Sequence, residues 1–223
     1  MKKIIITGAN GFIGTVLKKG LRDFDMTPMD LPDNDVCDYK KCFDIFPGHD
    51  AIVHLAWNTK EDCVISKKID PNNSLMFWNV YRGALETGVK RVVIASSVHA
   101  DSFYGGENEK KMSPNNVPSP DSPYGAHKVF MESLGRYYSK QGLEVVCIRF
   151  GGVIPENIPP EKGDNPYEFA ACLSHEDCTD LVEKCITVKK IPNNFTIIYG
   201  VSDNKDMVHD TSNPIGWVSK TKY

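Results

Sequence analysis

Short runs of β-branched apolar residues alternate along the chain with longer stretches of helical periodicity. The apolar runs predict strands at residues 4–6, 26–30, 50–56, 91–95, 143–150 and 195–199. The periodic stretches predict helices at residues 12–21, 39–46, 71–87, 122–141 and 174–188. Alternation of this kind predicts an α/β fold, a Rossmann-type doubly wound parallel sheet.

Irregular segments separate some of these elements. Residues 101–121 and 154–166 are rich in glycine or proline, and the first is too long for a simple connector, so we expect it to cover a site. Residues 31–36 leave no room for a full crossover helix. The chain from Ser202 onward is expected to be irregular, with Trp217 packing back on the core.

The first strand leads into a glycine-rich turn and a helix, the order that dinucleotide-binding proteins use. Gly8 allows a sharp turn, Gly11 lets the backbone approach a pyrophosphate, and Gly14 lets the helix pack close to the sheet. The N–H groups of the helix N-terminus attract phosphate. A purely structural turn is the alternative. The residues between the glycines that would also contact the cofactor are Asn10, Phe12 and Ile13.

Asp30 closes the second strand, about 20 residues after the glycines, where a carboxylate binds the adenosine ribose. Such a carboxylate repels a 2′-phosphate, so the sequence favours NAD over NADP. Alternatively, Asp30 only begins the turn that follows it. Asp35 and Val36 could flank the adenine or could equally be an ordinary strand end. The cofactor should also contact the end of the third strand, at Leu55, Ala56 and Trp57.

Composition narrows the class of protein. The chain has 223 residues, 41% of them hydrophobic, and a net charge of −3. We expect a single domain (residues 1–223), with a cofactor-binding core at 1–150 and a reduced substrate-binding portion at 151–223. Nothing suggests nucleic-acid or membrane partners or a signal peptide. Seven scattered cysteines indicate a reducing cytoplasm, and neither they nor the six histidines have metal-ligand spacing.

Tyr124 and Lys128 stand four residues apart and so share one helix face. An ammonium group near a phenol favours the phenolate, which lowers the pKa of Tyr124 and lets it exchange a proton with a substrate hydroxyl. Lys128 would also bind the nicotinamide ribose. A serine from Ser96–Ser97, at the end of a neighbouring strand, would hold the same substrate oxygen.

The motifs TGANGFIG, HLAW, IASS and YGAHK occur in this order and resemble the extended branch of the short-chain dehydrogenase/reductase superfamily, the NAD-dependent epimerase/dehydratase family. The resemblance implies that Ser97 is the catalytic serine, Tyr124 the acid/base and Lys128 its partner. It also implies that Asn73 helps to order the active site, although Asn73 could be a helix N-cap or serve both roles. Only about 70 residues follow Phe150, which disfavours a nucleotide-sugar substrate.

Further segments, among them ASSVHADSFYGG, PDSPYGAHK and CLSHEDC, are similar to uronate dehydrogenases and related aldose or aldose phosphate dehydrogenases. This similarity implies NAD-dependent oxidation of a small sugar at the anomeric carbon to a lactone. It also implies that His99 and Thr59 contact the sugar. The chain departs from the pattern where substrate is chosen, at Val98, Gly152 and Tyr167; Tyr167 stands in place of an arginine that pairs with a carboxylate.

The sequence therefore predicts an NAD-dependent sugar dehydrogenase, with uronate itself less favoured as substrate. An epimerase or reductase of a nucleotide-linked sugar and a non-catalytic NAD-binding sensor are the alternatives. The resemblance also suggests a homo-oligomer that pairs through the helices at 73–87 and 122–141.

Overall fold

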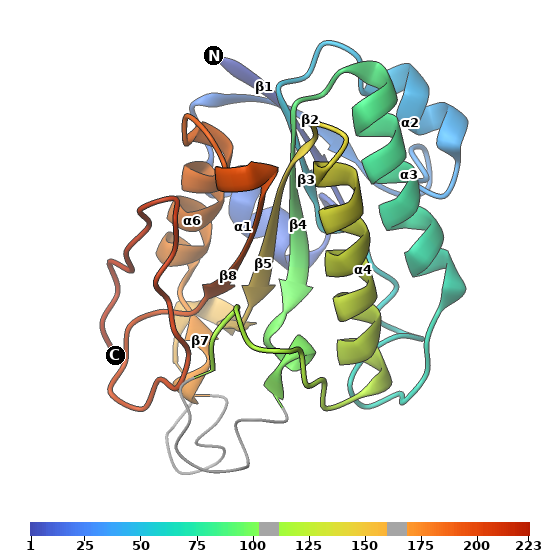
Figure 1. Cartoon of the computed structure of the whole chain (residues 1–223). Helices are drawn as coiled ribbons and strands as arrows, with labels where there is room; N and C mark the ends of the chain where they lie inside the picture. Colours follow the sequence, from blue (N-terminus) through green and yellow to red (C-terminus); the bar gives the residue numbers. More distant parts are fainter. Residues whose placement is uncertain (103–111, 160–168) are drawn as a thin grey trace.

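The chain folds around a parallel six-stranded sheet with helices on both faces (Figure 1). The computed structural model describes residues 1–102, 112–159 and 169–223. The strands, in chain order, are β1 (Lys2–Thr7), β2 (Phe24–Met29), β3 (Ala51–His54), β4 (Arg91–Ser97), β5 (Glu144–Phe150) and β8 (Phe195–Gly200). They lie in the order β2-β1-β3-β4-β5-β8.

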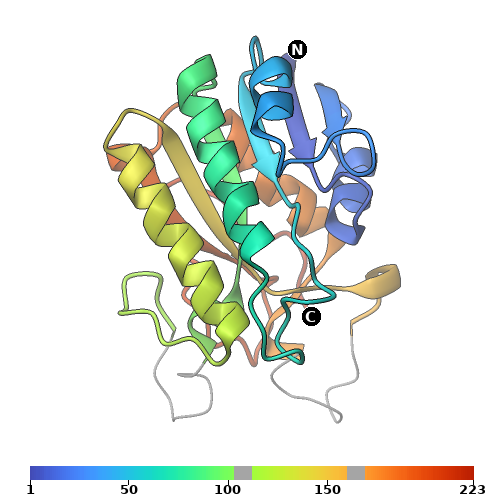
Figure 2. The same ribbon diagram turned by 90° about the vertical axis from the view of Figure 1, so that its right-hand side faces the viewer.

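Helices cover the sheet in two groups (Figures 1 and 2). On one face lie α2 (Tyr39–Ile45), α3 (Pro71–Thr87) and α4 (Pro123–Ser139), and on the other lie α1 (Phe12–Gly20) and α6 (His175–Thr187). Short 3₁₀ turns occur at η1 (Val98–Ala100), η3 (Pro155–Asn157) and η4 (Pro192–Asn194), and a small separate sheet pairs β6 (Gly152–Val153) with β7 (Cys172–Leu173). The predicted Rossmann-like class is confirmed; the small β6–β7 pair was not predicted.

Local chemistry explains where the long helices begin. The Asp70 side chain accepts a hydrogen bond from the N–H of Asn72 and caps α3, and Pro71 occupies the first turn. Ser122 caps α4 in the same way, so this helix begins at Pro123. The Ser174 hydroxyl accepts from the N–H of Asp177, as the sequence predicts for α6.

Two apolar cores fill the space between the layers. The core beneath α1 and α6 includes Leu17, Leu181 and Trp217, so Trp217 packs back as predicted. The core beneath α2, α3 and α4 includes Phe77 and Met131. Almost all of these side chains are withdrawn from solvent, and their burial supplies the main driving force for folding.

Two cations, buried Arg91 and exposed Lys2, tie α6 to the start of the sheet. Arg91, at the start of β4, donates hydrogen bonds to the carbonyl oxygens of Cys185, Ile186 and Val188 at 2.8–3.0 Å. Lys2 in β1 donates to the Ile186 carbonyl at 2.9 Å. The last carbonyls of a helix lack partners within the helix, and these two cations satisfy them.

The strand order places the site. From β1 the chain moves to one edge at β2 and then crosses to the other side at β3, so the order reverses between β1 and β3. In open parallel sheets, ligands bind outside the carboxyl ends of the strands at such a reversal. Those ends point downward in Figure 1.

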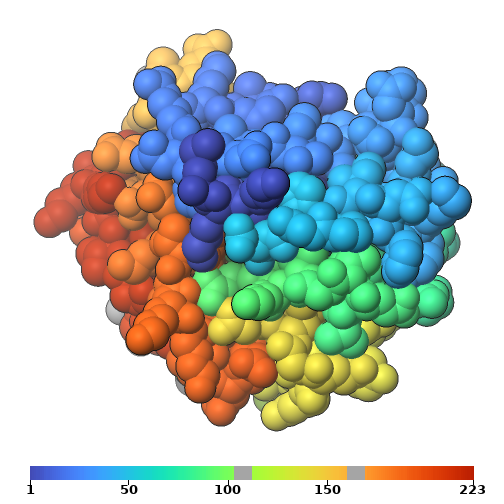
Figure 3. Space-filling model, turned by 90° about the horizontal axis from the view of Figure 1, so that it is seen from above, coloured from blue at the N-terminus to red at the C-terminus, as the bar shows by residue number. Residues whose placement is uncertain are grey.

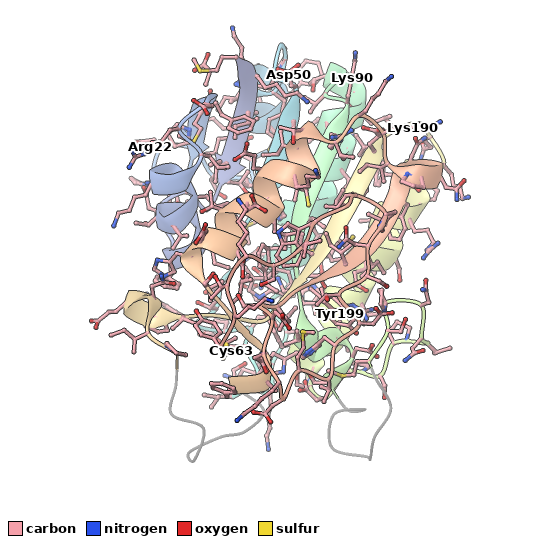
Figure 4. The ribbon with its side chains drawn as sticks, turned by 90° about the vertical axis from the view of Figure 1, so that its left-hand side faces the viewer. Arg22, Asp50, Cys63, Lys90, Lys190 and Tyr199 are labelled. Carbon is pink, nitrogen blue, oxygen red and sulfur yellow. The ribbon has the colours of Figure 1, made fainter. Side chains whose placement is uncertain are left out.

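The opposite end of the molecule carries the amino ends of the strands, and Figure 3 views the surface from there. Asp50, Lys90 and Lys190, labelled in Figure 4, lie at this end, away from the reversal point. In the ranges that the structure describes, the helices are too short or too polar to cross a bilayer.

Candidate functional site

A cavity of about 510 Å³ opens at the carboxyl ends of β1, β2 and β3. It lies at the reversal point of the sheet, where the sequence places the cofactor. The sequence-predicted residues that line it are Gly8, Gly11, Asp30, Asp35, Val36, Leu55, Ala56, Trp57 and Thr59. The structure therefore brings together predicted residues from three separate parts of the chain.

The glycine turn has little room for side chains. Gly8 has φ of +66°, and a Cβ there would lie 2.7 Å from the backbone nitrogen of Ala56. A Cβ on Gly14 would lie 2.6 Å from the Gly8 carbonyl oxygen, so only glycine lets α1 pack this closely. Gly11 precedes α1, and neither a capping side chain nor an acidic residue occupies the first turn. The N–H groups at this end are available to an anionic group.

The first two residues of α1 follow the turn directly. Phe12 is half exposed and makes an edge-to-face contact with His175. Ile13 packs partly against the core. The backbone N–H of Asn10 points toward the next strand, where it meets Asp30.

Asp30 follows β2 directly and is bound at both carboxylate oxygens. Oδ2 accepts a hydrogen bond from the N–H of Asn10 at 2.7 Å, and Oδ1 accepts from the N–H of Leu31 at 2.8 Å. Its carbonyl accepts from Asn34 and so also begins a turn, as the alternative interpretation expected. The carboxylate is thus held at the cavity wall beside the glycine turn.

Asp35 and Val36 lie in a turn and not in a strand. The Asp35 carboxylate accepts from the N–H of Cys37 at 2.8 Å. The Val36 side chain is buried, and its carbonyl accepts from Asn79 of α3 at 2.9 Å. Both residues line the cavity, so the strand-end alternative is wrong while contact with the adenine stays a prediction.

Ser97, Tyr124 and Lys128 come together between β4 and α4. The Ser97 side chain lies close enough to the Tyr124 phenol to lower its pKa as a hydrogen-bond donor, and the Lys128 ammonium donates to the Ala95 carbonyl at 2.8 Å. Ser96, the other serine, is buried and donates to Glu132 at 2.6 Å, which leaves Ser97 as the serine that faces Tyr124.

Burial is the largest influence on the pKa values of Tyr124 and Lys128. It raises the pKa of Tyr124 to about 12, against the lowering effect of the Ser97 hydrogen bond. It lowers the pKa of Lys128 to about 7, against the raising effect of Asp62 and Glu132. The expected lowering of the Tyr124 pKa by Lys128 is therefore not found, because desolvation of the phenol outweighs other effects.

Trp57 lines the cavity and also contacts the predicted catalytic residues. The Lys128 ammonium lies 3.4 Å from the centre of the indole ring, a cation–π contact, and the Tyr124 ring meets the indole edge-on at 5.9 Å. The indole N–H donates to the Asp62 carbonyl at 3.0 Å. Trp57 thus joins the predicted cofactor cavity to the predicted catalytic residues.

Asn73 orders the loop that follows β3. It is fully buried, its Oδ1 accepts from the N–H of Asn58 at 2.7 Å, and its Nδ2 donates to Asp62 at 3.1 Å. The alternative that Asn73 is the N-cap is wrong, because Asp70 caps α3. The amide fits an ordering role, since it binds two points of one loop.

The residues predicted to contact substrate divide into groups. His99 Nδ1 lies 2.7 Å from Asp121 Oδ2, and its ring meets that of Tyr124 at 5.9 Å. Val98 is buried and packs with Tyr199 and other apolar residues, so its side chain serves packing. Gly152 is exposed in β6, and Tyr167 lies outside the described residues.

The sequence interpretation missed two buried residues of the site. Asp62 and His127 are 65 residues apart in sequence, yet His127 Nδ1 lies 2.6 Å from Asp62 Oδ2. His127 directly precedes Lys128 in the YGAHK motif, and this position could have indicated that His127 belongs to the site. No local sequence pattern around Asp62 indicates that it pairs with His127.

Known proteins are similar to this chain over most of its length. The family model for the NAD dependent epimerase/dehydratase family matches residues 4–173. The chain is 31% identical over 231 residues to the L-arabinose 1-dehydrogenase (NAD(P)(+)) of Haloferax volcanii, covering 92% of this chain and 90% of that protein. It is 29% identical over 236 residues to the uronate dehydrogenase of Pseudomonas putida, covering 98% and 84%.

A solved structure agrees with these sequence matches. A mutated uronate dehydrogenase superposes with a TM-score of 0.84 at 26% identity, over 99% of this chain and 82% of the other. The similarity thus extends beyond the part matched by the family model, through α6 and β8.

Proposed function

The chain belongs to the NAD-dependent epimerase/dehydratase family, and on that premise we propose that it oxidises a small sugar or sugar acid at the anomeric carbon to a lactone. NAD is the cofactor of this NAD-dependent oxidoreductase. The observation that carries the proposal is that Ser97, Tyr124 and Lys128 converge beside the cavity formed by the glycine turn and Asp30.

The cavity residues fit a dinucleotide. The open N-terminus of α1 suits a pyrophosphate, and the Asp30 carboxylate suits the ribose hydroxyls. Trp57 and Thr59 would line the part of the cavity nearest the catalytic residues. When bound, NAD accepts the hydride and brings a positive nicotinamide ring that favours the Tyr124 phenolate.

The catalytic residues would divide the work. Ser97 holds the anomeric oxygen, and Tyr124 takes the proton of that hydroxyl. As the proton leaves the oxygen, the hydrogen on C1 leaves as a hydride, and the C1–O bond becomes the carbonyl of the lactone. In its ammonium form Lys128 would place a positive charge 5.4 Å from the Tyr124 ring centre, which favours the phenolate against the desolvation that raises the Tyr124 pKa.

The sugar itself would be chosen by residues at the open side of the site, within the substrate-binding portion at 151–223 and next to it. His99, held by Asp121, would bind sugar hydroxyls. Because Nδ1–H donates to Asp121 in the neutral ring, Nε2 would be an acceptor there. Tyr167 cannot neutralise a carboxylate, so we propose an aldose or aldose phosphate ahead of a uronate.

The test is NADH formation at 340 nm from NAD and a panel of arabinose, glucose, galactose, glucose 6-phosphate, glucuronate and galacturonate. We expect activity with at least one of them. Tyr124→Phe should lose about 10²–10⁴-fold in kcat, the usual contribution of general base catalysis, while NAD affinity is kept. Silence of the wild-type protein across the panel with NAD bound would contradict the proposal, as would full activity of Tyr124→Phe.

We propose further that two copies of the chain pair through α3 and α4, which lie side by side in Figure 2. Their outer surfaces carry large exposed side chains, Trp78 (47% exposed), Phe130 (50%) and Tyr137 (62%). Such a patch supports association. Sedimentation should give a dimer, and Tyr137→Glu should shift it to monomer; a monomeric wild type would contradict pairing.

The cytoplasm is the compartment that we propose. All seven cysteines are free thiols, and five of them are buried. Free thiols in this number suit a reducing environment.

A further inference from the structure

Asp62 and His127 form a buried pair that joins the loop after β3 to α4, the helix that carries Tyr124 and Lys128. The side chains are 0% and 2% exposed, and their facing atoms lie 2.6 Å apart. On its other side, His127 Nε2 lies 2.6 Å from the hydroxyl of Ser74 in α3. Asp62 Oδ2 also accepts from Asn73 and from the N–H of Asp70, at 3.1 and 3.2 Å.

The second carboxylate oxygen, Asp62 Oδ1, is buried and has no hydrogen-bond partner among the described residues. Leaving a buried carboxylate oxygen without a donor costs free energy of folding. Packing alone does not account for such a group, so its effect on the neighbouring residues has to be considered.

One effect is on Trp57. Its indole N–H donates to the Asp62 carbonyl at 3.0 Å, and its ring lies 4.9 Å from the His127 ring. The Lys128 ammonium lies 3.4 Å from the centre of the same indole ring. The main-chain carbonyl of Asp62 and the ring of His127 therefore contact Trp57 from two sides, and the Asp62–His127 side-chain pair ties these two points together in the orientation that contacts Lys128.

The other effect is electrostatic. Lys128 is buried, and desolvation opposes its charge while Asp62 and Glu132 favour it. Glu132 is itself bound by Arg149, which donates to both of its oxygens at 2.9 Å. Its negative charge is thus largely neutralised, which leaves Asp62 as the first of the two carboxylates that favour the charged form of Lys128.

We propose that Asp62 and His127 are positioning residues: the Asp62 charge keeps Lys128 as an ammonium, and the pair holds Trp57 against it. The inference rests on the proposed function, because that function gives Lys128 its task. The titratable and charged groups that act on Lys128 or Tyr124 from the surrounding elements are His54, Asp62, Cys63, His99, Asp121 and Glu132. His127 binds Asp62, and Arg149 binds Glu132. Cys63, labelled in Figure 4, marks this loop at the carboxyl end of the sheet.

The direct test is the titration of Lys128 by NMR in protein labelled with ¹³C at the lysine ε-carbons, with Lys128→Met to assign its signal. In Asp62→Asn, we expect the Lys128 pKa to fall by at least about one unit, a tenfold change in the ratio of its two forms. Glu61→Gln is the matched control, since Glu61 is adjacent but its side chain is 60% exposed, and it should leave the titration unchanged. Asp62→Ser replaces Asp62→Asn if the latter does not fold.

His127→Gln separates charge from structure. It keeps the Asp62 charge, so the Lys128 titration should stay close to that of the wild type. An equal shift in His127→Gln and Asp62→Asn, or no shift in Asp62→Asn, would overturn the electrostatic role.

Activity gives the second readout. With Asp62 neutral, Lys128 loses its proton at lower pH, and Tyr124 is freed from a nearby negative charge that raises its pKa. Both limbs of the pH profile of kcat/KM should therefore move to lower pH, whereas a loss that is equal at every pH would overturn the role. If the wild type has no activity on any sugar, the proposed function fails, yet the NMR titration still decides this inference.

Discussion

Replacing Glu132 by glutamine should destabilise the protein strongly. Glu132 of α4 and Arg149 of β5 are 3% and 0% exposed and are joined by two hydrogen bonds of 2.9 Å. Glu132 also accepts from Ser96 at 2.6 Å. Glu132→Gln keeps the shape but removes the charge, and it sets an amide N–H against the donors of a buried guanidinium.

The expected cost follows from this geometry. Breaking a buried ion pair by removing one partner typically costs about 3–5 kcal/mol, because an uncompensated charge stays buried. Asp101 remains as a partner of Arg149 at 3.1 Å, so we expect the lower part of that range. For a chain of this size, each kcal/mol lowers Tm by roughly 2–4 °C, which predicts a fall of at least about 6 °C.

Urea unfolding followed by circular dichroism measures the change, with Glu86→Gln as the control. Glu86 also pairs with an arginine, Arg82, at 2.8 Å, but both side chains are more than 40% exposed. The control should therefore change stability very little. If the two variants lose the same free energy of unfolding, burial is not what makes the Glu132 pair important, and the reasoning is refuted.

Three further outcomes follow from the described geometry. Asp30→Asn should lower the preference for NAD over NADP by about tenfold or more in kcat/KM, because a 2′-phosphate no longer meets a carboxylate; an unchanged ratio would remove Asp30 from the ribose site. Gly8→Ala should weaken NAD binding in calorimetry, whereas Gly88→Ala, also at positive φ but with nothing within 4 Å, should leave it intact. His54 is buried, and desolvation lowers its pKa to about 3. Between about pH 6.5 and 3, His54 therefore binds a proton in the unfolded chain but not in the folded protein. Stability should fall as pH drops from about 6.5 toward 3, and His54→Gln should flatten that slope by about one proton; an unchanged slope in urea midpoints would contradict this.

Much of the fold could be predicted because its signals are local. The β-branched runs match the sheet strands closely, and Ser174 caps α6 through the Asp177 N–H three residues on. The glycine turn could also be predicted from the sequence. Only glycine fits the positive φ at Gly8 and the close approach of α1 to the Gly8 carbonyl at Gly14. The strand end predicted a serine of the Ser96–Ser97 pair beside Tyr124, and the family resemblance pointed to Ser97, whose side chain acts on the phenol in the structure.

What the sequence could not predict depends on tertiary contact. Asp62 and His127 have no local pattern, because their relation arises only when the loop after β3 packs on α4. Val98 looks like a substrate contact from its place between Ser97 and His99, but η1 turns its side chain into an apolar cluster. The Tyr124 pKa is set by desolvation, which no spacing reveals.

The link between α6 and the start of the sheet bears on how the chain folds during synthesis. Arg91 and Lys2 bind the carbonyls at the end of α6, and α6 also packs against α1. Most of the core on the α3–α4 face can form once β5 has left the ribosome, and Phe195 and Ile197 of β8 join it later. The α1 face cannot be covered until α6 and the residues after 188 have been synthesised, so its apolar side is exposed on the nascent chain. The α1 side of the sheet is therefore the side that would need a chaperone.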